Sequence, residues 1–209
     1  MLTRVKHRIF PWISLTFLVA IMATVSVSNS AATSTAPDYT FPIVGCKYNY
    51  AHWHHDYPAT DILTKKGCHF VAPTSGIIDE VNRVDRYSWK NNGGALRGGL
   101  SISMVGDDGI RYYGSHFKKI YRKIISGYRV EVGELLAQVG TSGDAAGLAP
   151  HVHFGISWPT KAGIWWVRRG EIYPWKYLDA WQAGENKNPA KEVFAKERKV
   201  GTVPKRFGY

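Results

Sequence analysis

The sequence predicts a mainly β domain built from antiparallel sheets and hairpins. From Cys46 to about Trp158 it consists of short runs separated by glycine: HFVAPTSGIIDEVNRV, GGLSISMVGDDGIRYYGSHF, GYRVEVGELLAQVG and HVHFGIS. Apolar and polar residues alternate within these runs, and GDDG and TSGD supply turn residues, a pattern typical of antiparallel strands. No long helical stripe interrupts them, so we expect the helices to lie outside this region.

The segments on either side of these strands differ from them in composition. Residues 31–45 (AATSTAPDYTFPIVG) lack periodicity and are rich in small residues and proline, which predicts a linker before a domain at 46–160. After the domain, residues 161–209 are predicted to form an aromatic and basic C-terminal extension. Within it, YPWKYLDAWQAGE predicts one short helix and PAKEVFAKERK a second, weaker helical segment.

Residues 1–30 have the three parts of a secretory signal peptide. MLTRVKHR is basic, IFPWISLTFLVAIMATVSV is nearly all apolar, and SNSAAT is small and polar, which predicts cleavage near Ser30. An uncleaved membrane anchor is the alternative, because the apolar run is about long enough to span a bilayer. In both cases we expect the remaining chain to work outside the cytoplasm, secreted or held in the cell wall or envelope.

The chain is basic, with a formal charge of +11 that falls to +8 when the leader and its Arg4, Lys6 and Arg8 are removed. A basic exported protein concentrates at anionic polymers such as wall teichoic acids, at phospholipid headgroups or at nucleic acid. The alternative is that the charge serves only solubility. We expect no specific nucleic-acid partner, and the late cluster in NPAKEVFAKERKVGTVPKRFGY is typical of a solvated tail.

The only two cysteines are Cys46 and Cys68, both in the exported part of the chain. An even number of cysteines in an oxidising compartment favours a disulfide over two free thiols. The pair is too sparse for a zinc ribbon, which needs four ligands in close pairs.

Six of the eight histidines lie in three short segments, AHWHHDYPATD, YYGSHF and HVHF. His151 and His153 are two residues apart, so on a strand they share one face. His55 and Asp61 are six apart, an even separation that favours one face of an extended segment, whereas His54 is seven apart. Imidazole and carboxylate together suit a catalytic zinc site.

The remaining histidines are interpreted as peripheral. We expect His52 and His54 at the rim or surface, with the choice between His54 and His55 as first ligand left open, and His69 in a structural or exposed position. Aromatic residues near the histidines either line a cleft or pack in the ordinary way: Tyr112, Tyr113, Trp158, Trp165 and Trp166.

Five motifs in this order, HHDYPATDI, APTSGII, YYGSHF, GYRVEVGELLAQVGTSG and HVHF, resemble the lysostaphin/LytM-type zinc endopeptidases that cut peptidoglycan peptides. The resemblance covers residues 46–157 and implies a compact LytM-type catalytic domain with one zinc ion. It implies that His55, Asp61 and His153 hold the metal and that His116 and His151 are the catalytic histidines.

Two features depart from the family's usual pattern. Five residues separate His55 from Asp61 where the family commonly has three, and Tyr113 precedes His116 by three residues instead of two. Neither departure removes a functional group.

The implied chemistry is amide hydrolysis, in which zinc lowers the pKa of a bound water and polarises the scissile carbonyl. One of His116 and His151 would take the proton and the other would bind the developing oxyanion. The sequence contains neither HExxH nor GxSxG. The alternative function is a non-catalytic envelope protein that binds peptidoglycan or activates an amidase.

Overall fold

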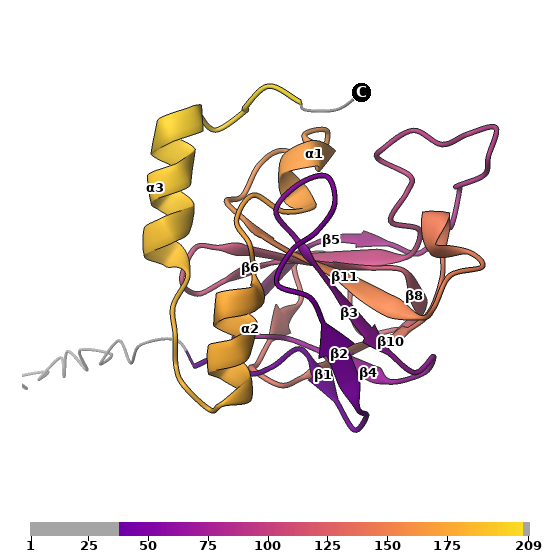
Figure 1. Ribbon diagram of the computed structural model, residues 1–209, viewed down its shortest axis with the longest axis horizontal. Helices are drawn as coiled ribbons and strands as arrows, with labels where there is room; N and C mark the ends of the chain where they lie inside the picture. The colour runs from indigo at the N-terminus through magenta and orange to yellow at the C-terminus, as the bar shows by residue number, and fades with distance from the viewer. Residues whose placement is uncertain (1–37, 207–209) are drawn as a thin grey trace, which may run out of the picture. The chain divides into compact units, whose positions relative to one another are not determined.

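Two antiparallel sheets form the framework of the computed structural model, which describes residues 38–206. One sheet has the strand order β1-β4-β10-β8 and the other β2-β3-β11-β7-β6-β5-β9 (Figure 1). This confirms the predicted mainly β fold class. The strands are β1 (Ile43–Val44), β2 (Tyr48–Tyr50), β3 (Thr60–Thr64), β4 (His69–Val71), β5 (Gly76–Asn82), β6 (Ser101–Gly106), β7 (Arg111–Ser115), β8 (Phe117–Ile120), β9 (Arg129–Val130), β10 (Leu135–Val139) and β11 (His151–Ser157).

The core lies where the inner faces of the two sheets meet. Phe70 of β4 packs against Phe117 and Phe154, with ring centroids 5.0 and 6.4 Å apart. Gly114 of β7 makes room for these rings, because a Cβ there would lie 2.7 Å from the Phe70 ring and 2.8 Å from the Phe117 ring. Alternate residues of β11, Val152 among them, are fully buried on this side, which turns His151 and His153 to the other.

The C-terminal extension packs onto the domain through three helices, α1 (Trp165–Arg168), α2 (Trp175–Gln182) and α3 (Ala190–Val200). The two helices that the sequence predicts in this region correspond to α2 and α3. Helix α2 buries Tyr177, Leu178 and Trp181, and Trp181 stacks on Tyr39 with ring centroids 5.3 Å apart. A 3-10 turn, η1 (Gly143–Ala145), precedes β11.

The fold begins within the segment interpreted as a linker. Phe41 and Ile43 are buried in the core, and β1 pairs with β4 through Ile43 and Phe70. The predicted leader at 1–30 lies outside the described residues. Between residues 38 and 206 there is no helix with both the length and the apolar character needed to cross a bilayer.

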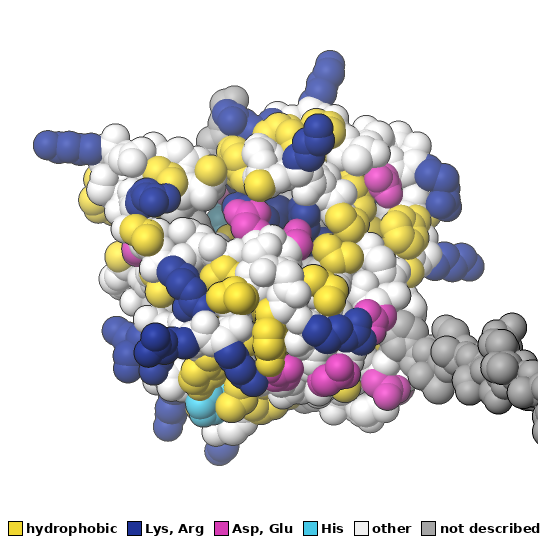
Figure 2. All heavy atoms as spheres, turned by 180° about the vertical axis from the view of Figure 1, so that it is seen from behind, with side chains coloured by type: hydrophobic (Ala, Val, Ile, Leu, Met, Phe, Trp, Pro, Cys, Tyr) yellow, Lys and Arg dark blue, Asp and Glu magenta, His cyan; other side chains and the backbone are white. Residues whose placement is uncertain are grey.

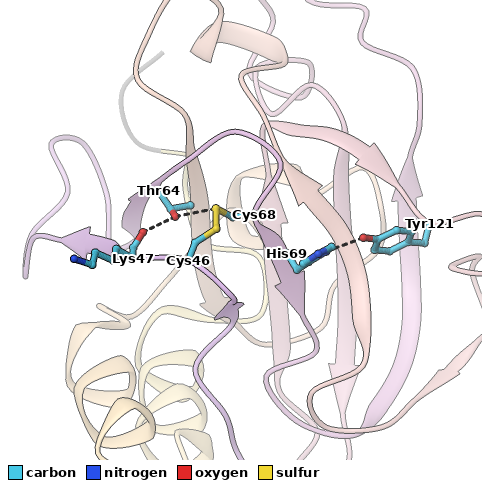
Figure 3. The surroundings of a disulfide bond; sticks show 6 residues. All are labelled: Cys46, Lys47, Thr64, Cys68, His69 and Tyr121. Atoms are coloured by element: carbon cyan, nitrogen blue, oxygen red, sulfur yellow. Dashed lines mark hydrogen bonds between the residues drawn. A yellow bond between two sulfur atoms is a disulfide. The ribbon is translucent and has the colours of Figure 1, made fainter.

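Cys46 and Cys68 form a disulfide, as predicted (Figure 3). Thr64 lies beside it and donates a hydrogen bond from Oγ1 to the Lys47 carbonyl at 2.7 Å. His69 was expected to be structural or exposed, and it is structural, with Nδ1 2.7 Å from the Tyr121 hydroxyl. The disulfide closes the loop that contains His54, His55 and Asp61.

Candidate metal centre and active site

Strand pairing brings Asp61, His116 and His153 together although they are far apart in the sequence. β11 lies between β3 and β7, so His153 is paired with Asp61 on one side and with Ser115 on the other. His116 directly follows β7 and is therefore next to this row. His54 comes from the loop between β2 and β3, which crosses above β11 beside α1 (Figure 1).

The ring of His153 is fixed by a backbone carbonyl. Its Nε2 lies 2.9 Å from the Arg169 carbonyl oxygen and its Nδ1 3.0 Å from Asp61 Oδ1. Because a carbonyl oxygen only accepts, Nε2 carries a hydrogen, and an Nδ1 without a proton directs its lone pair at the carboxylate. Two acceptors then face each other, an arrangement that a cation between them, or a proton on Nδ1, would make favourable.

His54 is held in the same way. Its Nδ1 donates to the Tyr57 carbonyl oxygen at 3.0 Å, which leaves Nε2 as an acceptor 3.8 Å from Asp61 Oδ2. The rings of His54 and His153 are 5.1 Å apart. Burial, followed by the charge of His153, lowers the pKa of His54 to about 4, so the ring is neutral near neutral pH.

Asp61 supplies the negative charge of the cluster. Burial opposes its ionisation, but the hydrogen bond and the positive charge that His153 supplies when it is protonated at Nδ1 outweigh burial and hold the pKa of Asp61 well below its usual range. The carboxylate is thus ionised and close to two imidazole nitrogens. In a tetrahedral zinc site with bonds of about 2.0–2.1 Å, ligand atoms lie roughly 3.3 Å apart, close to the separations found here.

His54 is buried, at 8% exposed, so the prediction that it lies at the rim or surface is wrong. His55 points outward: its side chain is 65% exposed and its Nε2 lies 3.5 Å from Asp56 Oδ2. Ligand atoms of His54, His55 and Asp61 nevertheless all lie within 4.8 Å of one another. The even-spacing argument fails because residues 55–58 form a bend instead of an extended segment. His52 lies at the surface, as expected, stacked on Trp175 with ring centroids 4.3 Å apart.

His116 and His151 form a pair beside this cluster, with ring centroids 4.8 Å apart. His116 Nδ1 donates to the Ser142 carbonyl oxygen at 2.9 Å and His151 Nδ1 to that of Ala149 at 2.8 Å. In its neutral form each ring therefore presents Nε2 as an acceptor. Burial, followed by the charges of His151 and His153, lowers the pKa of His116 to about 3.

The backbone of His116 is in an unusual conformation. It is the one non-glycine residue with positive φ, 66°, in the part of the chain that the structure describes. Its amide donates to the Gly98 carbonyl oxygen at 2.9 Å, and the residue is 7% exposed. Such backbone strain persists only where surrounding contacts enforce it, and it is common in active sites.

A cavity of about 190 Å³ is lined by five histidines, His55 included, and by Asp61. Of the aromatic residues considered from the sequence, Tyr113 and Trp165 line it, whereas Tyr112 and Trp158 are buried in the core. Residues 85–99 also contribute, because Gly94 packs against the Trp165 ring and Arg97 lines the opening. Above the strands the cavity is therefore bounded by the β2–β3 loop, residues 85–99, α1 and the turn at residues 144–148.

Comparison with known proteins identifies the architecture. No family model and no curated protein matches the sequence. Among solved structures, a candidate glycyl-glycine endopeptidase lytM from Ruminococcus gnavus superimposes with a TM-score of 0.53 and 20% identity, over 73% of this chain and 63% of that one. The domain has the fold of the lysostaphin/LytM-type peptidases.

Two further structures share this LytM-type fold. The antimicrobial peptidase lysostaphin from Staphylococcus simulans gives a TM-score of 0.51 at 19% identity, over 73% of this chain and 58% of that one. A candidate peptidase M23 from Pseudomonas aeruginosa gives 0.51 at 19% identity, over 70% and 52%. The chain thus spans between about half and two thirds of these proteins, and at such identity the likeness is one of fold.

Proposed function

We propose that this chain is an exported zinc metallopeptidase that hydrolyses peptide bonds of bacterial peptidoglycan. The observation that carries the proposal is the orientation of four histidines. Each ring gives one nitrogen to a backbone carbonyl and turns the other, as an acceptor, toward a single cavity that also holds an ionised carboxylate. Imidazole acceptors that converge with a carboxylate in this way suit a divalent metal.

The proposed metal ligands are Asp61, His153 through Nδ1, and one histidine of the β2–β3 loop. The resemblance to the family implies His55 for that third position, whereas burial and the direction of Nε2 favour His54. Zinc bound there would supply Lewis acidity, lowering the pKa of water and polarising the scissile carbonyl.

His116 and His151 would handle the proton. Because its low pKa makes His116 a weak base, His151 is the better acceptor for the proton of the attacking water. Once protonated at Nε2, His151 can donate to the leaving amine nitrogen. His116 Nε2 would accept a hydrogen bond from the same water and orient it.

Peptidoglycan as the substrate and the outside of the cell as the location rest on separate supports. A disulfide persists in an oxidising compartment, and the first thirty residues have the pattern of an export signal. Lysostaphin, which shares the fold, is described as an antimicrobial peptidase. Mass analysis of released muropeptides would identify the bond cut: a glycine bridge, a D-alanyl crosslink or a stem peptide.

Anionic wall polymers are a second proposed partner. In Figure 2, Lys and Arg side chains gather at the lower left of the face shown. Five exposed lysines, on β8 and on the turns that flank β2 and β4, form no ion pair within residues 38–206. They are Lys47, Lys65, Lys66, Lys118 and Lys119. Unpaired surface cations of this kind attract polyanions over a range that salt shortens.

The alternative is a LytM-like protein that binds peptidoglycan or activates an amidase without cutting. A binder needs neither His116 nor His151, and both are present and oriented toward the cavity. The two functions are separated by incubating residues 31–209 with purified sacculi, with and without a zinc chelator, beside His151→Ala. We expect clearing only by the unchelated wild type. Equal clearing in all three samples would exclude the zinc mechanism, and binding without clearing would favour the alternative.

A further inference from the structure

Residues 169 and 170, which follow α1, contact both segments that carry the candidate histidine ligands. The Arg169 carbonyl oxygen accepts the hydrogen bond from His153 Nε2 at 2.9 Å. Gly170 lies against the β2–β3 loop so closely that a Cβ there would be 2.1 Å from the Pro58 carbonyl oxygen, and its φ is +141°. Only glycine fits this position.

The opposite side of this contact also depends on a glycine. Gly155 lies two residues after His153 on β11, and a Cβ at this position would be 2.2 Å from the Arg169 carbonyl oxygen. Its missing side chain lets that carbonyl approach the strand and reach the His153 ring. The backbone at 169–170 is thus packed between β11 and the β2–β3 loop.

The side chain of Arg169 reaches the same loop. Its guanidinium lies 3.7 Å from the centroid of the Tyr57 ring and 5.2 Å from that of Trp165. Tyr57 is the residue whose carbonyl oxygen accepts from His54 Nδ1 at 3.0 Å. Arg169 therefore orients His153 through its main-chain carbonyl. Through its guanidinium it holds Tyr57, whose carbonyl oxygen orients His54.

The β2–β3 loop has few other restraints. In the described chain, no residue between 51 and 59 makes a backbone–backbone hydrogen bond. Contacts on its inner side include the Arg169–Tyr57 stack, the approach of Gly170 to Pro58, the His54–Tyr57 hydrogen bond and the Tyr57 hydroxyl 3.4 Å from His153 Nε2. A stacked cation and ring contribute about 0.5–2 kcal/mol, enough to decide between two arrangements of such a loop.

We infer that Arg169 is a positioning residue of the metal centre, so that the C-terminal extension is part of the machinery that binds zinc. The inference rests on the proposed metal site. Partners that orient ligands in this way alter metal affinity by about 10–100-fold when they are removed.

The test measures zinc affinity by competition with a chromophoric chelator, and the visible spectrum of the Co²⁺ form. We expect Arg169→Ala and Tyr57→Ala each to weaken zinc binding about tenfold and to alter the Co²⁺ bands. The double variant should be no weaker than the stronger single one, because both changes remove the same contact. Arg169→Lys, which keeps the charge but not the planar stack, should recover part of the affinity.

Arg206→Ala is the matched control. Arg206 also lies over the Trp165 ring, at 5.4 Å, but belongs to the C-terminal tail, so its loss should leave zinc affinity within about twofold of wild type. Melting curves of the metal-free variants identify any that fail to fold. Tyr57→Ala then remains informative, since it removes the stack from the loop side without changing α1, although it also removes the hydroxyl that lies 3.4 Å from His153 Nε2.

Three results would overturn the inference: wild-type affinity and spectrum in both single variants, an equal loss in Arg206→Ala, or additive losses in the double variant. Absence of zinc binding in the wild type would overturn it together with the proposed function. Zinc binding that depends on Arg169, in a protein that cuts no peptidoglycan, would leave the inference standing and refute the proposed function alone.

Discussion

Alanine at His54 and alanine at the adjacent His55 are matched changes with different expected effects on metal binding. His54 is 8% exposed and directs Nε2 at Asp61, whereas the side chain of His55 is 65% exposed. Four-ligand zinc sites bind with about 10–16 kcal/mol, or roughly 3 kcal/mol per ligand. We therefore expect His54→Ala to weaken zinc binding on the order of 100-fold. For His55→Ala we expect about twofold or less, as for other surface changes.

The assay is competition with a chromophoric chelator at neutral pH, with circular dichroism of each metal-free variant as the control for folding. A loss confined to His55→Ala would refute the reasoning from burial and return the first ligand to the position that the family resemblance implies. Equal losses in both variants would mean that the loop as a whole, and not one ring, determines affinity.

Four further outcomes follow from the structure. The pKa of His54 is lowered to about 4 and that of His116 to about 3, from 6.5 in the unfolded chain. As pH falls below 6.5, the unfolded chain therefore binds protons that the folded, metal-free chain does not. Urea titrations should then show the free energy of unfolding decreasing with falling pH, and a free energy that does not change with pH would contradict these shifts. Replacing Cys46 and Cys68 with serine should lower the free energy of unfolding by about 3 kcal/mol, measured in the same titrations, and an unchanged midpoint would count against the disulfide's role. Gly114→Ala should lower the melting temperature, since its Cβ would lie 2.7 Å from the Phe70 ring, and a wild-type melting curve would show that the core can adapt. Retention on immobilised poly(glycerol phosphate) should fall steeply with added salt, and retention that is insensitive to salt would exclude an electrostatic partner.

The strand framework and part of the site could be predicted from local sequence patterns. Alternation, glycine turns and the absence of a helical stripe are properties of short segments, and the mainly antiparallel fold follows from them. The two-residue spacing of His151 and His153 gave the correct face because β11 is a regular strand.

The histidine pair at 54 and 55 shows where such reasoning fails. Counting residues predicts a common face only along a pleated strand, and the bend at residues 55–58 breaks that periodicity. Pro58, directly after Tyr57, was a signal that the segment would not form a regular pleated strand. If Pro58 is taken into account, His54, whose side chain is held by the Tyr57 carbonyl, becomes a candidate for the first metal ligand.

The contribution of Arg169 could not be read from residue types. Its main-chain carbonyl orients His153, and every residue has such a carbonyl. What distinguishes this position is the close approach allowed by Gly155 and Gly170, which only the tertiary structure reveals. The start of the fold at β1 was missed for a related reason, because a strand of two residues is too short to show alternation.

The most direct test of the account is anomalous diffraction at the zinc edge from crystals of the zinc-loaded protein. We expect one strong peak per chain between the Asp61 carboxylate and His153 Nδ1, within bonding distance of His54 Nε2, with His116 and His151 facing it from the cavity. A peak elsewhere, coordination of His153 through Nε2, or no peak in crystals grown with zinc would contradict the central claim.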